Sequence, residues 1–211
     1  ALIGRAFLLM SFPAEMTSWH RPFAGIVDAA SSATPLNMMK QGAALTDVVA
    51  SIGAEDYGDF LWQLFLGNRG GSLGESSILL IAVGGLLLLA TGVIRIWIPA
   101  AMLGSTALIS WLLGMDPLLA LLSGGVAFGA VFMATDYATS PMTTKGMLIY
   151  GAGIGLVVVL IRKLGGFPEG ATYGILVMNM LSPYLDGLRE RKYGCERPAG
   201  KTRAAPKEAK E

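Results

Sequence analysis

Five apolar segments follow one another in the second half of the chain, and they constrain its fold more than any other feature. Their approximate bounds are 78–94, 97–113, 117–134, 147–164 and 171–185. Each is close to the minimum of about 17 residues that a helix needs to cross a bilayer. Because unpaired backbone N–H and C=O groups are costly in lipid, such segments cross it as helices. The pattern predicts an all-α polytopic membrane protein.

The composition agrees with a membrane protein, since 15% of the residues are charged and 53% are hydrophobic. Soluble domains carry about 25% charged residues. The single cysteine, Cys195, excludes an internal disulfide, and the single histidine, His20, does not make a metal site. We therefore expect no metal site. The chain also has no interleaving of basic and aromatic residues, so we expect no nucleic-acid partner.

Glycine pairs interrupt two of the apolar segments, at Gly84–Gly85 and Gly124–Gly125. Short, glycine-broken spans are typical of transporter-like folds with discontinuous helices. A solute transporter or channel without a redox role is therefore one functional hypothesis.

The chain divides into four regions. Residues 1–12 are apolar without a charged start and cleavage site, so they are interpreted as the end of a transmembrane helix, not a signal peptide. Residues 13–77 are a long extramembrane loop, 78–188 hold the five spans, and 189–211 form a charged tail expected to be disordered. This organisation indicates the C-terminal part of a longer subunit.

Within the extramembrane loop, the apolar run from Phe60 to Leu66 is too short to span a bilayer and suits an interfacial helix. Packing against the subunit's own membrane core and docking of a partner are equally compatible with it.

The charge distribution predicts an orientation. Five spans place the 13–77 loop and the tail on opposite sides, and the tail is rich in Lys and Arg while the loop is mainly acidic. The positive-inside rule then puts the tail in the cytoplasm and the loop outside. Arg162 and Lys163 fall on the outer side in this arrangement, against the rule, and snorkelling of their long side chains could relieve the conflict.

A short polar stretch in the loop reads D-A-A-S-S-A-T-P-L, from Asp28 to Leu36. Pro35 restricts its own φ and biases Thr34 towards an extended conformation. An exposed threonine among small residues is a weak nucleophile but a good acceptor for an enzyme that attaches a phosphoryl-linked group.

The pattern D-x-x-S-x-A-T resembles the flavinylation motif of the membrane subunits of Rnf and Na⁺-translocating NADH:quinone oxidoreductase complexes. The resemblance implies FMN bound to Thr34 through a phosphoester, attached by a flavin transferase that recognises Asp28. Ser31, Ser32 and Ala33 complete the motif, and Ser32 departs from it because the family usually has glycine there.

Three further blocks resemble the same family, in the same order along the chain: N-R-G-G-S-L-G-E-S-S at 68–77, D-Y-A-T-S-P-M-T-T-K-G at 136–146, and F-P-E-G to M-N-M-L-S-P-Y-L-D at 167–186. The later blocks favour the D-type subunit of Rnf over its quinone-reducing relative. Asp136, Thr139 and Asn179 are candidate cofactor or ion contacts, because polar residues within spans often mark functional sites. For Asn179, a hydrogen bond that connects neighbouring helices is an equally good interpretation.

The resemblance implies a transporter-like bundle with an inverted repeat in the bacterial cytoplasmic membrane. It also implies electron transfer between ferredoxin and NAD coupled to Na⁺ or H⁺ translocation, beside iron–sulfur subunits and a second covalent-FMN subunit. A second, non-covalent flavin, riboflavin or FMN, is implied too. A flavin outside the membrane cannot take hydride directly from cytoplasmic NADH, so a relay subunit is favoured over a complete enzyme. Two alternatives are a component like the B-type subunit of the Na⁺-translocating NADH:quinone oxidoreductase and a purely structural scaffold.

Overall fold

The computed structural model describes residues 2–12, 38, 45–54, 56–67, 74–165 and 170–187, and these residues form helices and turns with no β-strand. The all-α prediction is therefore confirmed for the described part of the chain. The helices are α1 (Leu2–Ser11), α4 (Leu45–Ile52), α5 (Tyr57–Leu66), α6 (Ile78–Ala90), α7 (Trp97–Leu112), α8 (Pro117–Leu122), α9 (Val126–Phe128), the π-helix η1 (Gly129–Met133), α10 (Thr144–Leu164) and α11 (Ala171–Gly187).

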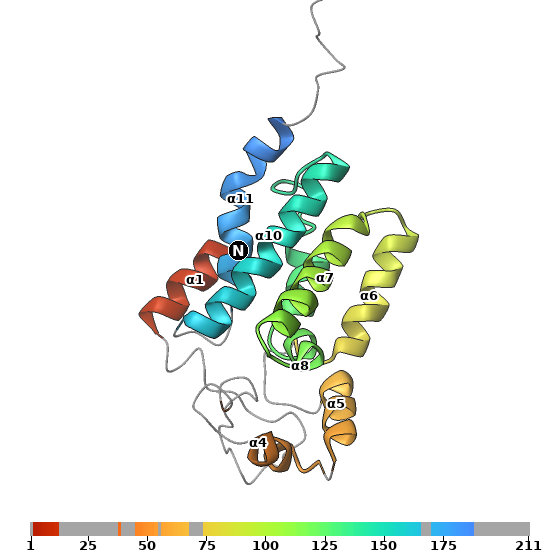
Figure 1. The fold of residues 1–211 in the computed structure, drawn as a ribbon. Coiled ribbons are helices and arrows are strands. Elements are labelled where there is room, and N and C mark those ends of the chain that lie inside the picture. Colours follow the sequence, from red (N-terminus) through yellow and green to blue (C-terminus); the bar gives the residue numbers. More distant parts are fainter. Residues whose placement is uncertain are drawn as a thin grey trace, which may run out of the picture.

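The long helices form a bundle with α10 between α7 and α11 (Figure 1). The short helices α4, α5 and α8 lie at one end of this bundle, called here the α5 end. The last residues of α11 lie at the opposite end, called here the α11 end.

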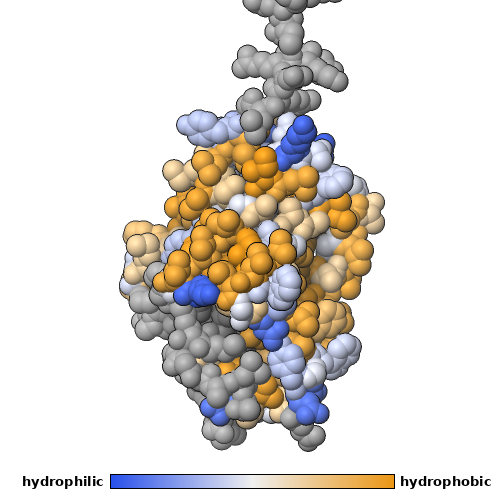
Figure 2. Space-filling model, viewed as in Figure 1, coloured by the Kyte–Doolittle hydropathy of each residue, from blue (hydrophilic) through white to orange (hydrophobic). Residues whose placement is uncertain are grey.

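Among the described residues, α10 is the one helix that is long and apolar enough to cross a membrane, and its 21 residues extend over about 31 Å. The helices α1, α6 and α7 are apolar but shorter. Apolar side chains also cover much of the surface in Figure 2. On α6 alone, Leu80, Val83 and Leu86 are each more than half exposed. An apolar surface of this extent is unusual for a soluble monomer and suits contact with lipid.

Small residues bring α7 and α10 close together. A Cβ added to Gly151 would lie 2.7 Å from the Ala101 Cβ, and one added to Gly155 would lie 2.0 Å from the Ser105 Oγ. Packing of small residues four apart is the usual way in which membrane helices approach each other closely.

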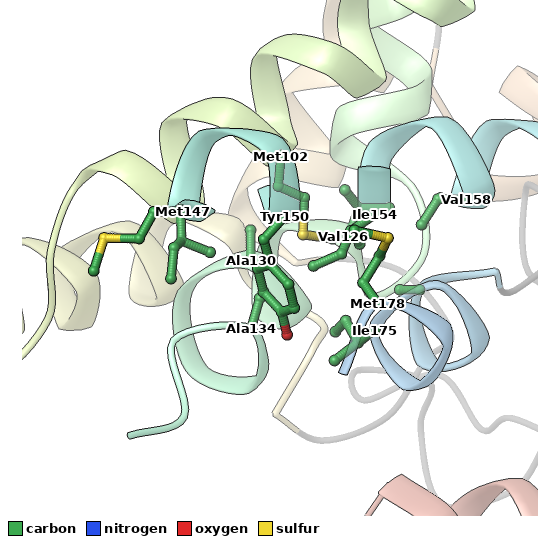
Figure 3. Close-up of a cluster of buried hydrophobic side chains, with 12 residues drawn as sticks. Met102, Val126, Ala130, Ala134, Met147, Tyr150, Ile154, Val158, Ile175 and Met178 are labelled. Atoms are coloured by element: carbon green, nitrogen blue, oxygen red, sulfur yellow. The ribbon is translucent and has the colours of Figure 1, made fainter. Parts of the chain in front are cut away.

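The main core lies where this helix pair meets α11 and η1. Side chains from these four elements and from α9 point toward one another (Figure 3). The labelled members are Met102, Val126, Ala130, Ala134, Met147, Tyr150, Ile154, Val158, Ile175 and Met178.

The third apolar segment is not one helix. The helix α8 ends at Leu122, Ser123 is extended, and Gly124 has a φ of +68°, after which α9 and η1 continue the segment. Only glycine adopts this φ without strain, so the predicted interruption at Gly124–Gly125 is confirmed.

The predicted interruption at Gly84–Gly85 is wrong, because α6 runs through both residues. Instead, α6 packs closely against η1 at these two glycines. A Cβ on Gly84 would lie 3.1 Å from the Phe132 Cζ, and one on Gly85 would lie 3.0 Å from the Val131 Cγ1. The absence of side chains lets α6 approach η1.

A second, smaller core joins α4 and α5 to the bundle. Phe60 and Leu64 of α5 are buried against Val48 of α4 and Leu119 of α8. The apolar run of α5 therefore packs, on one face, against the chain's own broken segment.

Candidate functional site

The predicted flavinylation motif, with Asp28, Ser31, Ser32, Ala33 and Thr34, lies outside the described residues. Its role stays a prediction. Asp136 and Thr139 belong to the segment between η1 and α10, which lies at the α11 end (Figure 1). Asn179 lies in the middle of α11.

Asp136 and Thr139 lie together in one turn. The Thr139 Oγ1 donates to the Asp136 Oδ2 at 3.3 Å, and the Ser140 N–H donates to the Asp136 carbonyl at 3.0 Å. The Asp136 side chain is exposed, so its carboxylate can still be reached by an ion or a polar ligand.

Asn179 joins two helices. Its Oδ1 accepts a hydrogen bond from the hydroxyl of Tyr150, which is fully buried on α10. The interpretation of Asn179 as a connection between helices is thus confirmed. Because Oδ1 is used in this bond, the amide NH₂ is the end of Asn179 that can donate to a ligand.

Tyr150 was not predicted from the sequence, and its hydroxyl donates to the Asn179 Oδ1. The Asp136 carboxylate lies near the same tyrosine, so both candidates are neighbours of one buried side chain. Asp136, Thr139, Tyr150 and Asn179 are called here the α11-end cluster. The only signal for Tyr150 in the sequence is one tyrosine inside an apolar run, which ordinary packing explains equally well.

Asp186, near the end of α11, binds the segment that carries Asp136 and Thr139. Its Oδ1 accepts from the Met142 N–H at 2.8 Å, and Arg95 Nη1 donates to the Met142 carbonyl at 3.3 Å. The segment between η1 and α10 is thereby attached to both α11 and the turn after α6.

A second polar group surrounds the helix break. Arg5 of α1 and Glu75 form an ion pair at 2.6 Å, and the Glu75 side chain is 9% exposed. A Cβ on Gly125 would lie 3.0 Å from the Glu75 Cδ, so the carboxyl group packs directly against the glycine of the break. Arg5 thus faces protein, where its charge is paired; a lone charge facing lipid would be costly.

Arg162 approaches the same break from α10. It is 5% exposed, and it donates to the carbonyl oxygens of Ala120 at 2.6 Å and Ser123 at 2.9 Å. Lys163 donates to the Leu113 carbonyl at 2.9 Å. Arg162 is therefore buried and does not snorkel, and both cations bind carbonyl oxygens at helix C-termini, where positive charge is favourable.

The arrangement therefore has polar groups at the α11 end and around the helix break, with an apolar core between them. No group of three or more His, Cys, Asp or Glu side chains in the described residues could hold a metal ion. The α11-end cluster offers an exposed carboxylate, hydroxyls and an amide, which suit an ion or a polar ligand.

The chain matches known proteins over most of its length. The model of the NQR2, RnfD, RnfE family matches residues 1–194. The chain is 40% identical over 206 residues to the D-type subunit of the proton-translocating ferredoxin:NAD(+) oxidoreductase complex of Clostridium ljungdahlii, covering 93% of this chain and 61% of the relative.

Two further relatives are similar. The D-type subunit of the Na(+)-translocating ferredoxin:NAD(+) oxidoreductase complex of Acetobacterium woodii is 43% identical, with 92% of this chain and 58% of the relative covered. The D-type subunit of the ion-translocating oxidoreductase complex of Stutzerimonas stutzeri is 38% identical, with 92% and 62% covered. The chain thus spans about three fifths of the length of these relatives.

Proposed function

Because this chain belongs to the NQR2, RnfD, RnfE family, we propose that it is the covalent-FMN membrane subunit of an Rnf-type complex. In this proposal the complex transfers electrons between ferredoxin and NAD and couples the transfer to Na⁺ or H⁺ movement. The observation that carries it is the similarity to the D-type subunits of two ferredoxin:NAD(+) oxidoreductase complexes. Their names specify different ions, a proton and Na⁺, so either ion fits this chain.

The attachment site proposed for FMN is the Thr34 hydroxyl, with Asp28 recognised by the flavin transferase. When bound, FMN supplies the electron-transfer chemistry, and the chain supplies its position. Met38, four residues after Thr34, packs against the core formed by Val48, Phe60, Leu64 and Leu119. Four residues of chain reach about 14 Å at most, so this contact supports a flavin at the α5 end.

Asp136, Thr139 and Asn179 are proposed contacts for an ion or for a second, non-covalent flavin at the α11 end. The exposed Asp136 carboxylate and the amide NH₂ of Asn179 are the groups that would bind it. Tyr150 would hold Asn179 in orientation by its hydrogen bond.

In this proposal the two sites are at opposite ends of a bundle whose longest helix extends over about 31 Å. A subunit arranged in this way is a relay that needs partners on both sides. The proposal therefore includes iron–sulfur subunits and a second covalent-FMN subunit of the same complex. It places the subunit in the bacterial cytoplasmic membrane, with the α5 end outside and the C-terminus in the cytoplasm.

The first test is intact mass and in-gel fluorescence of the denatured subunit, made in cells that contain the flavin transferase. We expect a mass increment of one FMN and ultraviolet fluorescence in the wild type, and neither in Thr34→Ala. A Ser32→Gly variant restores the family residue and should be flavinylated at least as completely. Absence of the increment from both the wild type and Ser32→Gly would contradict the proposal.

One observation favours a second class of function. The break at Gly124, beside the charged Glu75 and Arg162, is what a solute transporter or channel with a discontinuous helix would also contain. Electron transfer through a complex with Thr34→Ala separates the classes. Loss of transfer in a variant that still assembles supports the redox relay, whereas unchanged transfer supports a transporter, a channel or a scaffold.

A further inference from the structure

The helix α5 has a second apolar face that its own core does not use. Phe60 and Leu64 are buried, but Trp62 is 58% exposed and Leu66 is 48% exposed. Phe65 stacks against Trp62, with ring centroids 5.8 Å apart. An exposed tryptophan, supported by a phenylalanine and a leucine within one helical turn, is a large apolar surface for a helix of 10 residues.

This face is next to the apolar surface of the bundle. The end of α5 meets the beginning of α6 closely, because a Cβ on Gly67 would lie 2.9 Å from the Ser77 Cα. The first outward residue of α6 that follows is Leu80, which is 68% exposed. The exposed apolar surfaces of α5 and α6 thus belong to adjoining elements.

Aromatic residues mark the level of this face relative to a bilayer. Trp97 and Trp111 stand at the two ends of α7, and both are exposed. Exposed tryptophans at both ends of an apolar helix are typical of the two membrane–water interfaces. Trp111 belongs to the α5 end, since α7 is followed by Asp116, which bonds to Tyr57 of α5. The level of Trp111 is therefore close to that of α5.

The charge on α5 limits the kind of surface that it fits. Asp56 precedes the helix and Asp59 lies in its first turn, where the Gln63 Nε2 donates to the Asp59 Oδ2 at 2.9 Å. The helix has no Lys or Arg, so anionic lipid would not attract it. With about 15 Å of length it does not span a bilayer. Burial of apolar surface is the interaction that remains.

We propose that the face of α5 formed by Trp62, Phe65 and Leu66 is inserted into the headgroup region of the bilayer leaflet at the α5 end. The partner is a neutral lipid surface, which holds the loop before α5 at the membrane. This inference rests on the proposed membrane location and not on the flavin, so its test is independent of the mass measurement on Thr34.

The test uses the full chain in lipid nanodiscs made with phosphatidylcholine brominated either near the headgroup or near the chain ends. In the variant that retains only Trp62, with Trp19, Trp97 and Trp111 changed to phenylalanine, we expect stronger quenching by the headgroup-proximal bromines. The variant that retains only Trp111 is the positive control. Trp62→Phe in the otherwise native chain should lose the same quenching component, which guards against misfolding of the triple variant.

Three results would overturn the proposal. Quenching of Trp62 by aqueous acrylamide but by neither lipid would mean that the face is in water. Protection from acrylamide and from both lipids, with Trp111 still quenched by lipid, would mean that protein covers it. Greater quenching in vesicles with anionic lipid than in neutral ones would contradict the apolar mode of binding.

Discussion

At the residue scale, Arg162 illustrates how a buried charge is used in this fold. Its guanidinium binds two carbonyl groups that the end of α8 leaves without helical partners. A hydrogen bond from a charged donor contributes about 1.5–3 kcal/mol, and carbonyls left unsatisfied in the interior are costly. The long-range bonds, 42 and 39 residues apart in sequence, connect the helix break to α10.

We therefore predict that Arg162→Ala destabilises the subunit by about 2–4 kcal/mol, because two buried carbonyls lose a charged donor. The measurement is thermal unfolding in detergent, followed by circular dichroism. Lys163→Ala is the matched control, since that side chain is exposed and donates to one carbonyl. Equal destabilisation by the two variants would contradict the role assigned to Arg162.

Tyr57 gives a pH-dependent contact at the same scale. Its hydroxyl donates to the Asp116 Oδ2 at 2.6 Å, and burial together with this carboxylate raises its pKa from 10.0 to about 12. A raised pKa means that the neutral phenol is the form that the folded state stabilises. The contribution to docking is complete below pH 10 and is lost as the pH rises through about 12.

We predict that the contact between α5 and α8 weakens between pH 10 and 12 in the wild type and that Tyr57→Phe removes this part of the dependence. At neutral pH, Tyr57→Phe should lower the free energy of unfolding by about 0.5–1.5 kcal/mol, the usual net contribution of one hydrogen bond. Protease sensitivity of the segment before α5, measured across this pH range, reports the contact. Identical profiles for the two proteins would exclude Tyr57 as the titrating group.

At the element scale, the pair α7–α10 depends on residues without side chains. Gly155→Ala would place a methyl group 2.0 Å from the Ser105 Oγ, 2.9 Å from the Thr106 N and 3.0 Å from the Met102 O. Two of these three neighbours are backbone atoms of α7, which a rotamer change does not move. The helices must therefore separate.

We predict that Gly155→Ala destabilises the bundle by about 1–3 kcal/mol, the usual cost of overpacking. Gly104→Ala on α7 is the control, because nothing lies within 4 Å of its added Cβ, and it should be neutral or stabilising by up to about 1 kcal/mol. Both values come from unfolding in the same detergent. A neutral Gly155→Ala would show that α7 and α10 pack less closely than described.

The two glycine pairs show how far sequence patterns lead at this scale. Run length and apolar character predicted α6, α7, α10 and α11 to within a few residues, and α10 begins earlier than expected because the Thr143 hydroxyl caps it. The pairs at 84–85 and 124–125 look alike in sequence. One breaks a helix and the other packs against η1, since the outcome depends on Val131 and Phe132, which are distant in sequence.

The candidate site was predictable to a similar extent. Asp136, Thr139 and Asn179 could be named because polar residues in or beside spans are conspicuous. Tyr150 and Arg162 could not be assigned roles, because their partners lie 29 and 42 residues away and are set by helix packing.

At the scale of the whole molecule, the number of crossings decides which sites share a side of the membrane. Helix length alone does not show whether the broken segment formed by α8, α9 and η1 crosses the membrane, since none of its helices is long enough to span a bilayer. In the fold, α8 contacts α5 at one end, and the segment after η1 bonds to Asp186 at the other. The segment therefore passes from one end of the bundle to the other despite its break.

We predict from this path that the extramembrane helices and the C-terminal tail are on opposite sides of the membrane. Cys195, the single cysteine, serves as a native probe of the tail. A membrane-impermeant maleimide should label it in inverted vesicles and not in spheroplasts. A second probe is Gly53→Cys, made in a chain that also carries Cys195→Ser. Gly53 is exposed and directly follows α4, which lies at the α5 end of the bundle. This cysteine should be labelled in spheroplasts and not in inverted vesicles.

The two labelling patterns distinguish the number of membrane crossings from the orientation of the subunit in the membrane. Opposite labelling with the tail outside would keep the five crossings and reverse the sidedness proposed from the positive-inside rule. Labelling of both positions from the same side would mean that the α8–α9–η1 segment enters and leaves the membrane at one face. In that case the Arg162 bonds would hold a re-entrant element, and the sites proposed near Thr34 and Asp136 could not lie on opposite sides of the bilayer.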